Sequence, residues 1–132
     1  MQHGLLALAV LVTFAGAGHA GPAKNFDDYK AALLAAQDQY RTAVDRCKPM
    51  KGNARDVCKV ESKADYDVTK AQLKDRYQPT PGHDKKVRVE KAEAAYRIAV
   101  EKCADLKGDA RKVCRRDAVT QYRTVMNASA AR

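Results

Sequence analysis

The sequence predicts an all-α protein built from two antiparallel helical hairpins, each closed by a disulfide bond. Three observations predict this fold class: an internal repeat, a helical spacing of apolar side chains, and a cysteine pair in each copy of the repeat. Segments 40–58 and 96–114 match at eleven of nineteen positions, at one offset of 56 residues and without a gap. A unit repeated with its own cysteine pair indicates a duplicated, cross-linked structural element.

Apolar side chains recur at the spacing of helices that pack lengthwise. In each repeat they form two rows with a period of seven residues, and the second row lies three residues after the first. The rows are Phe26, Leu33, Tyr40 and Cys47 with Tyr29, Ala36 and Ala43, and then Val89, Tyr96 and Cys103 with Ala92, Ala99 and Leu106. This pattern predicts four helices, at roughly residues 24–47, 54–77, 85–105 and 110–127.

The two cysteines of each repeat flank a segment that interrupts the helix. In the first repeat Pro49 disfavours helix at the preceding residue, and Gly52 suits a left-handed or loop position. Asn53 is expected to cap the next helix, and Gly108 and Asp109 take the same parts in the second repeat. Each repeat is therefore expected to form a hairpin of two helices.

The Pro- and Gly-containing stretch 78–82 cannot continue a helix smoothly and separates the two hairpins. The predicted organisation is a signal peptide, a first hairpin, a linker and a second hairpin that ends in a frayed tail. Their ranges are 1–20, 21–78, 79–83 and 84–132. The hairpins either fold together as a slender four-helix bundle or remain two units about the linker.

Residues 1–20 have the layout of a cleaved secretory signal. They contain no Asp, Glu, Lys or Arg, and a short apolar run leads to small residues that end at Ala20. His3 stands where such signals usually carry Lys or Arg. The apolar run is shorter than the roughly 20 residues needed to cross a bilayer, so no transmembrane anchor is expected. Export to an oxidising compartment predicts that the four cysteines form disulfides.

Four cysteines allow three pairings. The local pairing, Cys47–Cys58 and Cys103–Cys114, closes each hairpin beside its loop and is the one we expect. The crossed pairing, Cys47–Cys114 and Cys58–Cys103, requires each eleven-residue spacing to run as one continuous helix. That helix would have to pass through Pro49 and Gly52.

The part of the chain after the signal has little material for a hydrophobic core. Leu, Ile, Val and Phe make up 16 of its 112 residues, and it contains no Trp. So low a share, with a net charge of +9, approaches the composition of disordered chains. Either the helices pack through thin alanine-rich seams, or the disulfides supply part of the stability.

The residue types needed for catalysis are scarce in this chain. After the signal, His83 is the only histidine, and we expect it in a solvated loop. The ten residues between paired cysteines match neither the short spacings of structural zinc sites nor a Cys-x-x-Cys redox motif. The sequence therefore predicts no enzyme activity, no metal and no cofactor.

The basic excess is the one feature with potential binding chemistry, and it is uneven. Residues 21–78 hold 12 basic and 9 acidic residues, whereas 79–132 hold 13 and 7. The candidate anion-binding residues are Arg111, Lys112, Arg115 and Arg116, with Lys85, Lys86 and Arg88 as a second group. Such groups suit lipopolysaccharide, anionic lipid or nucleic acid, and the alternative is that the charge only keeps a helical surface soluble.

The repeated block carries a resemblance to a known group of proteins. Residues 103–114 read Cys-Ala-Asp-Leu-Lys-Gly-Asp-Ala-Arg-Lys-Val-Cys, and the block recurs at 47–58. It resembles the block Cys-Asp-x-Leu-x-Gly-Asn-Ala-Lys-x-Val-Cys of small exported Ala/Lys-rich proteins of proteobacteria, some labelled as TolA-like cell-envelope biogenesis proteins. The resemblance implies a bacterial periplasmic location and no catalytic residues. The Lys48-Pro49 pair departs from the usual block.

These observations predict a non-catalytic periplasmic envelope protein with a structural or interaction role. The alternative is a polyanion-binding module that uses the basic face of the second repeat. The expected partner is a cell-envelope protein or an anionic surface. The alanine-rich seams also allow pairing between copies of the chain.

Overall fold

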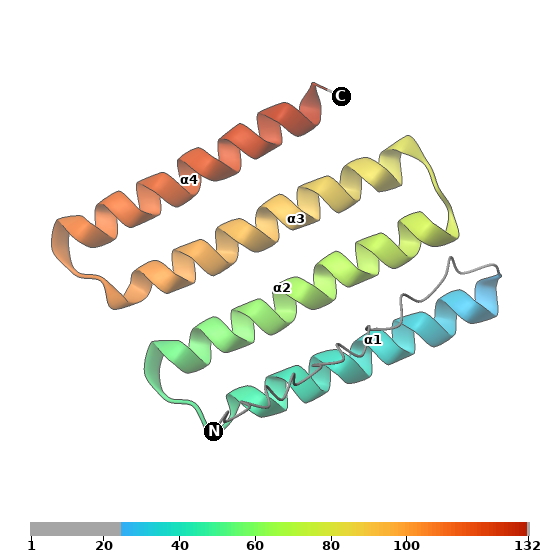
Figure 1. Cartoon of the computed structure of the whole chain (residues 1–132), viewed down its shortest axis with the longest axis horizontal. Helices are drawn as coiled ribbons and strands as arrows, with labels where there is room; N and C mark the ends of the chain where they lie inside the picture. The colour runs from blue at the N-terminus through green and yellow to red at the C-terminus, as the bar shows by residue number, and fades with distance from the viewer. Residues whose placement is uncertain (1–24, 132) are drawn as a thin grey trace, which may run out of the picture.

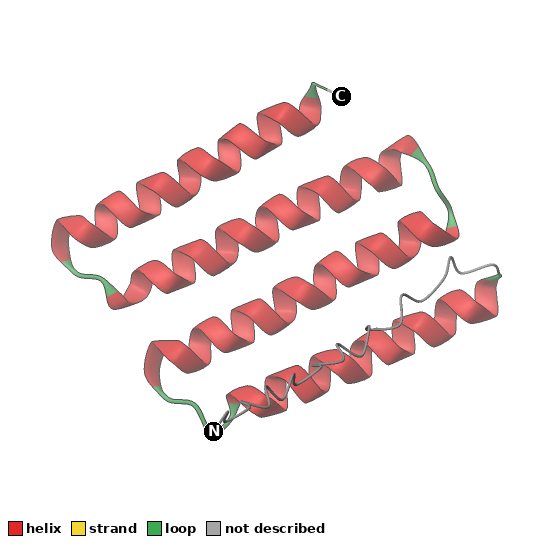
Figure 2. Cartoon of the chain, in the orientation of Figure 1, coloured by secondary structure: helices red, strands yellow, loops and turns green. Residues whose placement is uncertain are grey.

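The computed structural model describes residues 25–131, and within them it contains four α-helices and a short 3-10 helix. The predicted all-α fold is confirmed (Figures 1 and 2). The elements are α1 (Phe26–Cys47), α2 (Gly52–Tyr77), α3 (Pro81–Lys102), η1 (Cys103–Asp105) and α4 (Gly108–Ala130). The predicted signal at 1–20 lies outside the described residues.

The helices lie antiparallel and side by side in one layer (Figure 1). Each packs against its neighbours in the chain: α1 against α2, α2 against α3, and α3 against α4. Because the α2–α3 contact joins the two hairpins, they fold together rather than as separate units. The result is an open four-helix bundle with two broad exposed faces.

Side-chain caps begin the first helix of each hairpin. The Asn25 side chain accepts a hydrogen bond from the backbone N–H of Asp28 at 2.9 Å, and Thr80 Oγ1 accepts one from the N–H of His83 at 3.0 Å. Pro81 occupies the first turn of α3, where its missing N–H costs nothing. The connection between the hairpins is therefore shorter than the predicted 79–83 linker.

The second helix of each hairpin starts in a way that sequence reasoning did not anticipate. Gly52 and Gly108 both have a φ angle of 56°, the left-handed conformation expected for them. Each of them is, however, already the first residue of its helix. The N-cap positions are Lys51 and Lys107, and neither side chain makes a capping bond. The predicted cap by Asn53 is wrong, because its amide instead reaches across to the carbonyl of Glu101.

The core is a set of thin seams, as the composition indicated. Its buried apolar residues are Ala36, Cys47, Ala64, Leu73, Val87, Ala92, Ala94, Cys103 and Ala118. Paired tyrosines fill the spaces beside the alanines. Tyr40 stacks on Tyr66 with ring centroids 5.0 Å apart, and the equivalent pair Tyr96–Tyr122 lies at 5.1 Å. Phe26 was expected in the seam but is 57% exposed, because it begins α1, where its ring lies tilted beside that of Tyr77.

The C-terminal tail, expected to fray, is helical as far as Ala130. Ser129 is buried there, and its hydroxyl donates to the carbonyl of Val125 at 2.8 Å. The helix therefore extends beyond the predicted limit at residue 127.

Ala64→Leu is expected to destabilise the protein, because Ala64 is fully buried where α2 approaches α3. Extra methyl groups in so close a seam cost about 1–3 kcal/mol in the free energy of unfolding. The matched control is Thr120→Leu, at the equivalent but exposed position of α4. This substitution should change the free energy of unfolding by less than about 0.5 kcal/mol. Urea unfolding of both variants checks this, and equal effects would contradict close α2–α3 packing.

Candidate functional site

The disulfides follow the predicted local pairing and lie at one end of the layer. Cys47–Cys58 joins α1 to α2, and Cys103–Cys114 joins α3 to α4, with Cα–Cα distances of 5.6 and 5.8 Å. Cys47 and Cys103 are 0% exposed. Each bridge thus fixes the separation of two helices next to their loop. The bridges indicate an oxidising, exported environment.

Each hairpin has a shallow groove along its seam, and equivalent residues line both. The α1–α2 groove has a volume of about 440 Å³ and includes Ala36, Tyr40 and Tyr66. Ala92, Tyr96 and Tyr122, at the 56-residue offset, line a depression between α3 and α4. α1 is parallel to α3 and α2 to α4 in the layer, so both grooves open on the same face, here called the groove face. Sequence reasoning missed these grooves.

The predicted basic group at the start of α4 is largely occupied with local contacts. The Arg111 guanidinium donates to the carbonyls of Leu106 and Ala104, and so holds the α3–α4 loop. Lys112 Nζ lies 3.1 Å from the Asp109 carboxylate, and Arg116 Nε lies 3.7 Å from that of Asp117. Within residues 25–131, no partner is seen for the exposed Arg115.

The second predicted group, at the start of α3, lies far from the first. Because α3 and α4 run antiparallel, Lys85, Lys86 and Arg88 lie at the opposite end of the layer (Figure 1). Arg88 pairs with Asp84, and Lys86 Nζ lies 2.7 Å from the Glu90 carboxylate. The hydrogen bond that Lys86 donates to the Glu90 carboxylate raises the pKa of Lys86. The two groups therefore do not form one anion-binding patch.

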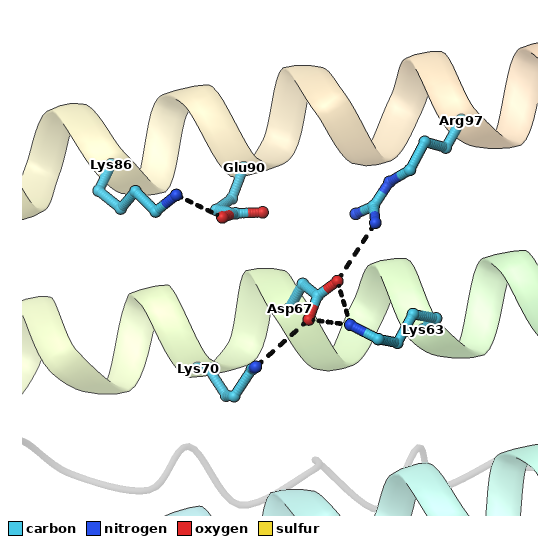
Figure 3. A network of polar contacts seen from close by, with 6 residues as sticks. All are labelled: Lys63, Asp67, Lys70, Lys86, Glu90 and Arg97. Atoms are coloured by element: carbon cyan, nitrogen blue, oxygen red, sulfur yellow. Dashed lines mark hydrogen bonds and ion pairs between the residues drawn. The ribbon is translucent and has the colours of Figure 1, made fainter.

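A polar network joins α2 to α3 across the hairpin boundary (Figure 3). The Asp67 carboxylate accepts from Lys63 Nζ at 2.5 and 2.6 Å and from Arg97 Nη1 at 3.3 Å, and Lys70 Nζ lies 3.4 Å away. The Asp67 side chain is only 13% exposed. Burial alone would raise its pKa, but the hydrogen bonds and charge of Lys63, with Arg97 and Lys70, outweigh burial and lower the pKa.

Two more polar contacts connect the hairpins nearer the disulfide end. Lys102 Nζ lies 2.8 Å from the Glu61 carboxylate, and Asn53 Nδ2 donates to the Glu101 carbonyl at 3.2 Å. Together with the Asp67–Arg97 pair, these contacts fix how α2 lies against α3.

α2 gathers four lysines on one face, which also carries Asp56 and Asp67, while two further carboxylates lie on the other face. Lys59, Lys63, Lys70 and Lys74 follow at spacings of four, seven and four residues, which keeps them within about 60° around the helix axis. Glu61 and Asp65, each two residues from a lysine, point about 200° away and line the groove of the other face. We call the side of the layer that carries the four lysines the lysine face.

The lysine face extends onto the neighbouring helices. The Asp67 network continues onto α3 through Arg97, and Glu90 and Lys86 precede Arg97 along the same side of α3 at helical spacings of seven and four residues (Figure 3). Arg115 of α4 is the repeat equivalent of Lys59, so the two begin the same face on parallel helices. The alternation of Lys59, Glu61, Lys63 and Asp65 was the signal in the sequence, and it becomes informative once the helices lie in a single layer.

No protein-family model, curated protein or solved structure matches this chain. Among the helices at residues 26–130, none has the length and apolar character needed to cross a membrane. Within the described part of the chain, no cluster of three or more His, Cys, Asp or Glu side chains is arranged to hold a metal ion.

Proposed function

We propose that this protein is a non-catalytic component of the bacterial periplasm that acts through interaction with the cell envelope. The observation that carries the proposal is the open layer of helices, whose two broad faces are both exposed. The disulfide bonds fix α1 against α2 and α3 against α4 within it. The clustering of four lysines on one face of α2 supports an interaction role, because grouped cations attract anionic partners. The periplasm is the exported compartment implied by the resemblance of the repeated cysteine block to small exported proteins of proteobacteria.

Co-sedimentation tests this proposal. The oxidised protein, purified from the exported fraction, is mixed with isolated membranes and with peptidoglycan at physiological salt. We expect saturable binding to one of these fractions. Hydrolytic or redox turnover by the pure protein that is lost in His83→Ala or in Cys→Ser variants would overturn the proposal.

Polyanion binding through the second repeat is a second candidate function, favoured by the exposed and unpartnered Arg115. Arg111 holds the loop, so a test that replaces it would also disturb the fold. Arg115→Gln/Arg116→Gln is the cleaner variant. We expect binding to DNA or lipopolysaccharide that falls steeply with salt and weakens in this variant. Binding that is insensitive to salt would contradict this function.

A further inference from the structure

We propose that the lysine face of the layer docks on the surface of an anionic phospholipid bilayer. This inference rests on the interaction role proposed above and names the partner. Lys59, Lys63, Lys70 and Lys74 form a stripe along α2, and Arg115 adds a cation on α4. Lys63 and Lys70 of this stripe pair with Asp67, and Lys86 pairs with Glu90. Lys59 and Lys74 have no carboxylate partner within residues 25–131, although Asp56 lies on the same side of α2. On the opposite face, Glu61 and Asp65 line the groove together with Arg46, and Glu61 pairs with Lys102.

Exposed apolar side chains lie at one corner of the lysine face. Leu34 is 62% exposed and occupies the repeat equivalent of Glu90, so it lies on the same face. Phe26 is the next most exposed large apolar residue of the described chain, and Lys30 Nζ lies 5.5 Å from the centre of its ring. Apolar side chains flanked by lysines are suited to the boundary between lipid headgroups and acyl chains.

The tyrosines make this face less suited to nucleic acid. Single-stranded nucleic acid is bound by stacking its bases on free aromatic rings. Here Tyr66 stacks on Tyr40 and has Lys70 Nζ 4.6 Å from its ring centre, and Tyr29 stacks on Tyr77 at 4.7 Å. These rings are occupied by protein groups. A one-layer protein also presents its helices to a flat surface simultaneously, which a bilayer provides.

The test compares two double variants with the same change in net charge. Lys59→Gln/Lys74→Gln removes two cations from the lysine face. Arg46→Gln/Lys91→Gln removes two from the other side, since Arg46 lines a groove and Lys91 precedes the groove residue Ala95 by one turn. Neither Arg46 nor Lys91 has an ion-pair partner within residues 25–131. Circular dichroism confirms that each variant is folded.

The oxidised proteins are titrated with vesicles of phosphatidylcholine alone and of phosphatidylcholine with about a third phosphatidylglycerol, at physiological salt. We expect binding to the anionic vesicles, weakened about fivefold for each lysine removed from the lysine face and much less in the control variant. If both variants lost the same vesicle affinity, binding would depend on net charge alone, and the lysine face would not be the docking surface. Absence of binding to anionic vesicles would overturn the inference outright.

Leu34→Gln distinguishes a lipid surface from another polyanion. We expect it to weaken vesicle binding and to leave any binding to duplex DNA unchanged. Strong DNA binding combined with a neutral Leu34→Gln variant would assign the face to nucleic acid instead and contradict the lipid proposal. If vesicles fail to bind while envelope fractions still do, only this inference fails. If neither binds, the interaction role fails with it.

Discussion

Loss of both disulfide bonds is expected to lower the melting temperature by more than about 10 °C. Each bridge closes a short loop, with a sequence separation of 11, and contributes about 3 kcal/mol in the chain-entropy model. The alanine seams bury little apolar area per residue, so the helices depend on the bridges more than those of a thick-cored bundle would. Circular dichroism melts with and without reductant, with free thiols counted, measure the effect.

The two bridges are expected to contribute unequally. Within residues 25–131, one tyrosine pair joins α3 to α4, whereas two stacked tyrosine pairs join α1 to α2. Serine replacement of Cys103 and Cys114 should therefore lower the melting temperature more than replacement of Cys47 and Cys58. It should also speed hydrogen exchange in α4 selectively. An unchanged melt after confirmed reduction would show that helix packing alone suffices.

Asp67→Asn is expected to destabilise the protein by about 2 kcal/mol at neutral pH, because it removes a mostly buried, charge-assisted acceptor. Arg97 depends on that acceptor, since its Nε and Nη2 atoms are buried without a hydrogen-bond partner. Urea unfolding measures the loss. Asp109→Asn is the matched control: this carboxylate also pairs with a lysine, but its side chain is 92% exposed, and its removal should change little.

The loss in Asp67→Asn should depend on pH with a defined sign. The pKa of Asp67 is lowered in the folded protein, so its carboxylate stabilises the fold fully above the ordinary value of 3.8. That contribution disappears as the pH falls through the lower pKa of the folded state. The stability difference between the native protein and Asp67→Asn should therefore be constant near neutrality and shrink in acid. A difference that grows in acid, or equals that of Asp109→Asn, would contradict this role.

Much of the fold was predictable because the repeat carries it. The 56-residue offset, the heptad rows and the breakers at Gly52 and Gly108 predicted four helices and the local disulfide pairing. The local disulfide pairing could be predicted because Pro49 and Gly52 break the helix between Cys47 and Cys58. The loop between them lets the two cysteines face each other from neighbouring helices. The α2–α3 contact was not predictable, because it depends on how each helix is rotated about its axis. Only the structure brings Asp67 and Arg97, thirty residues apart, together.

The anion-binding residues remain a prediction, but the structure adds contacts that the sequence did not reveal. Counting charge along the chain selected the start of α4, but Arg111 is committed to loop carbonyls there. The second predicted group, on α3, lies at the other end of the layer. The spacing of the four lysines on α2 can be read from the sequence. It defines an exposed surface only because the layer is open on both sides.

The most direct test of a two-faced layer is a footprint of lysine reactivity on anionic vesicles. The oxidised protein is treated with an amine-reactive reagent with and without vesicles, and modification is read residue by residue by mass spectrometry. We predict that Lys59 and Lys74 become protected while Lys91, toward the groove face, stays reactive. Protection of Lys91 equal to that of Lys59, or protection of none of the three, would contradict the assignment of the lysine face as the interaction surface.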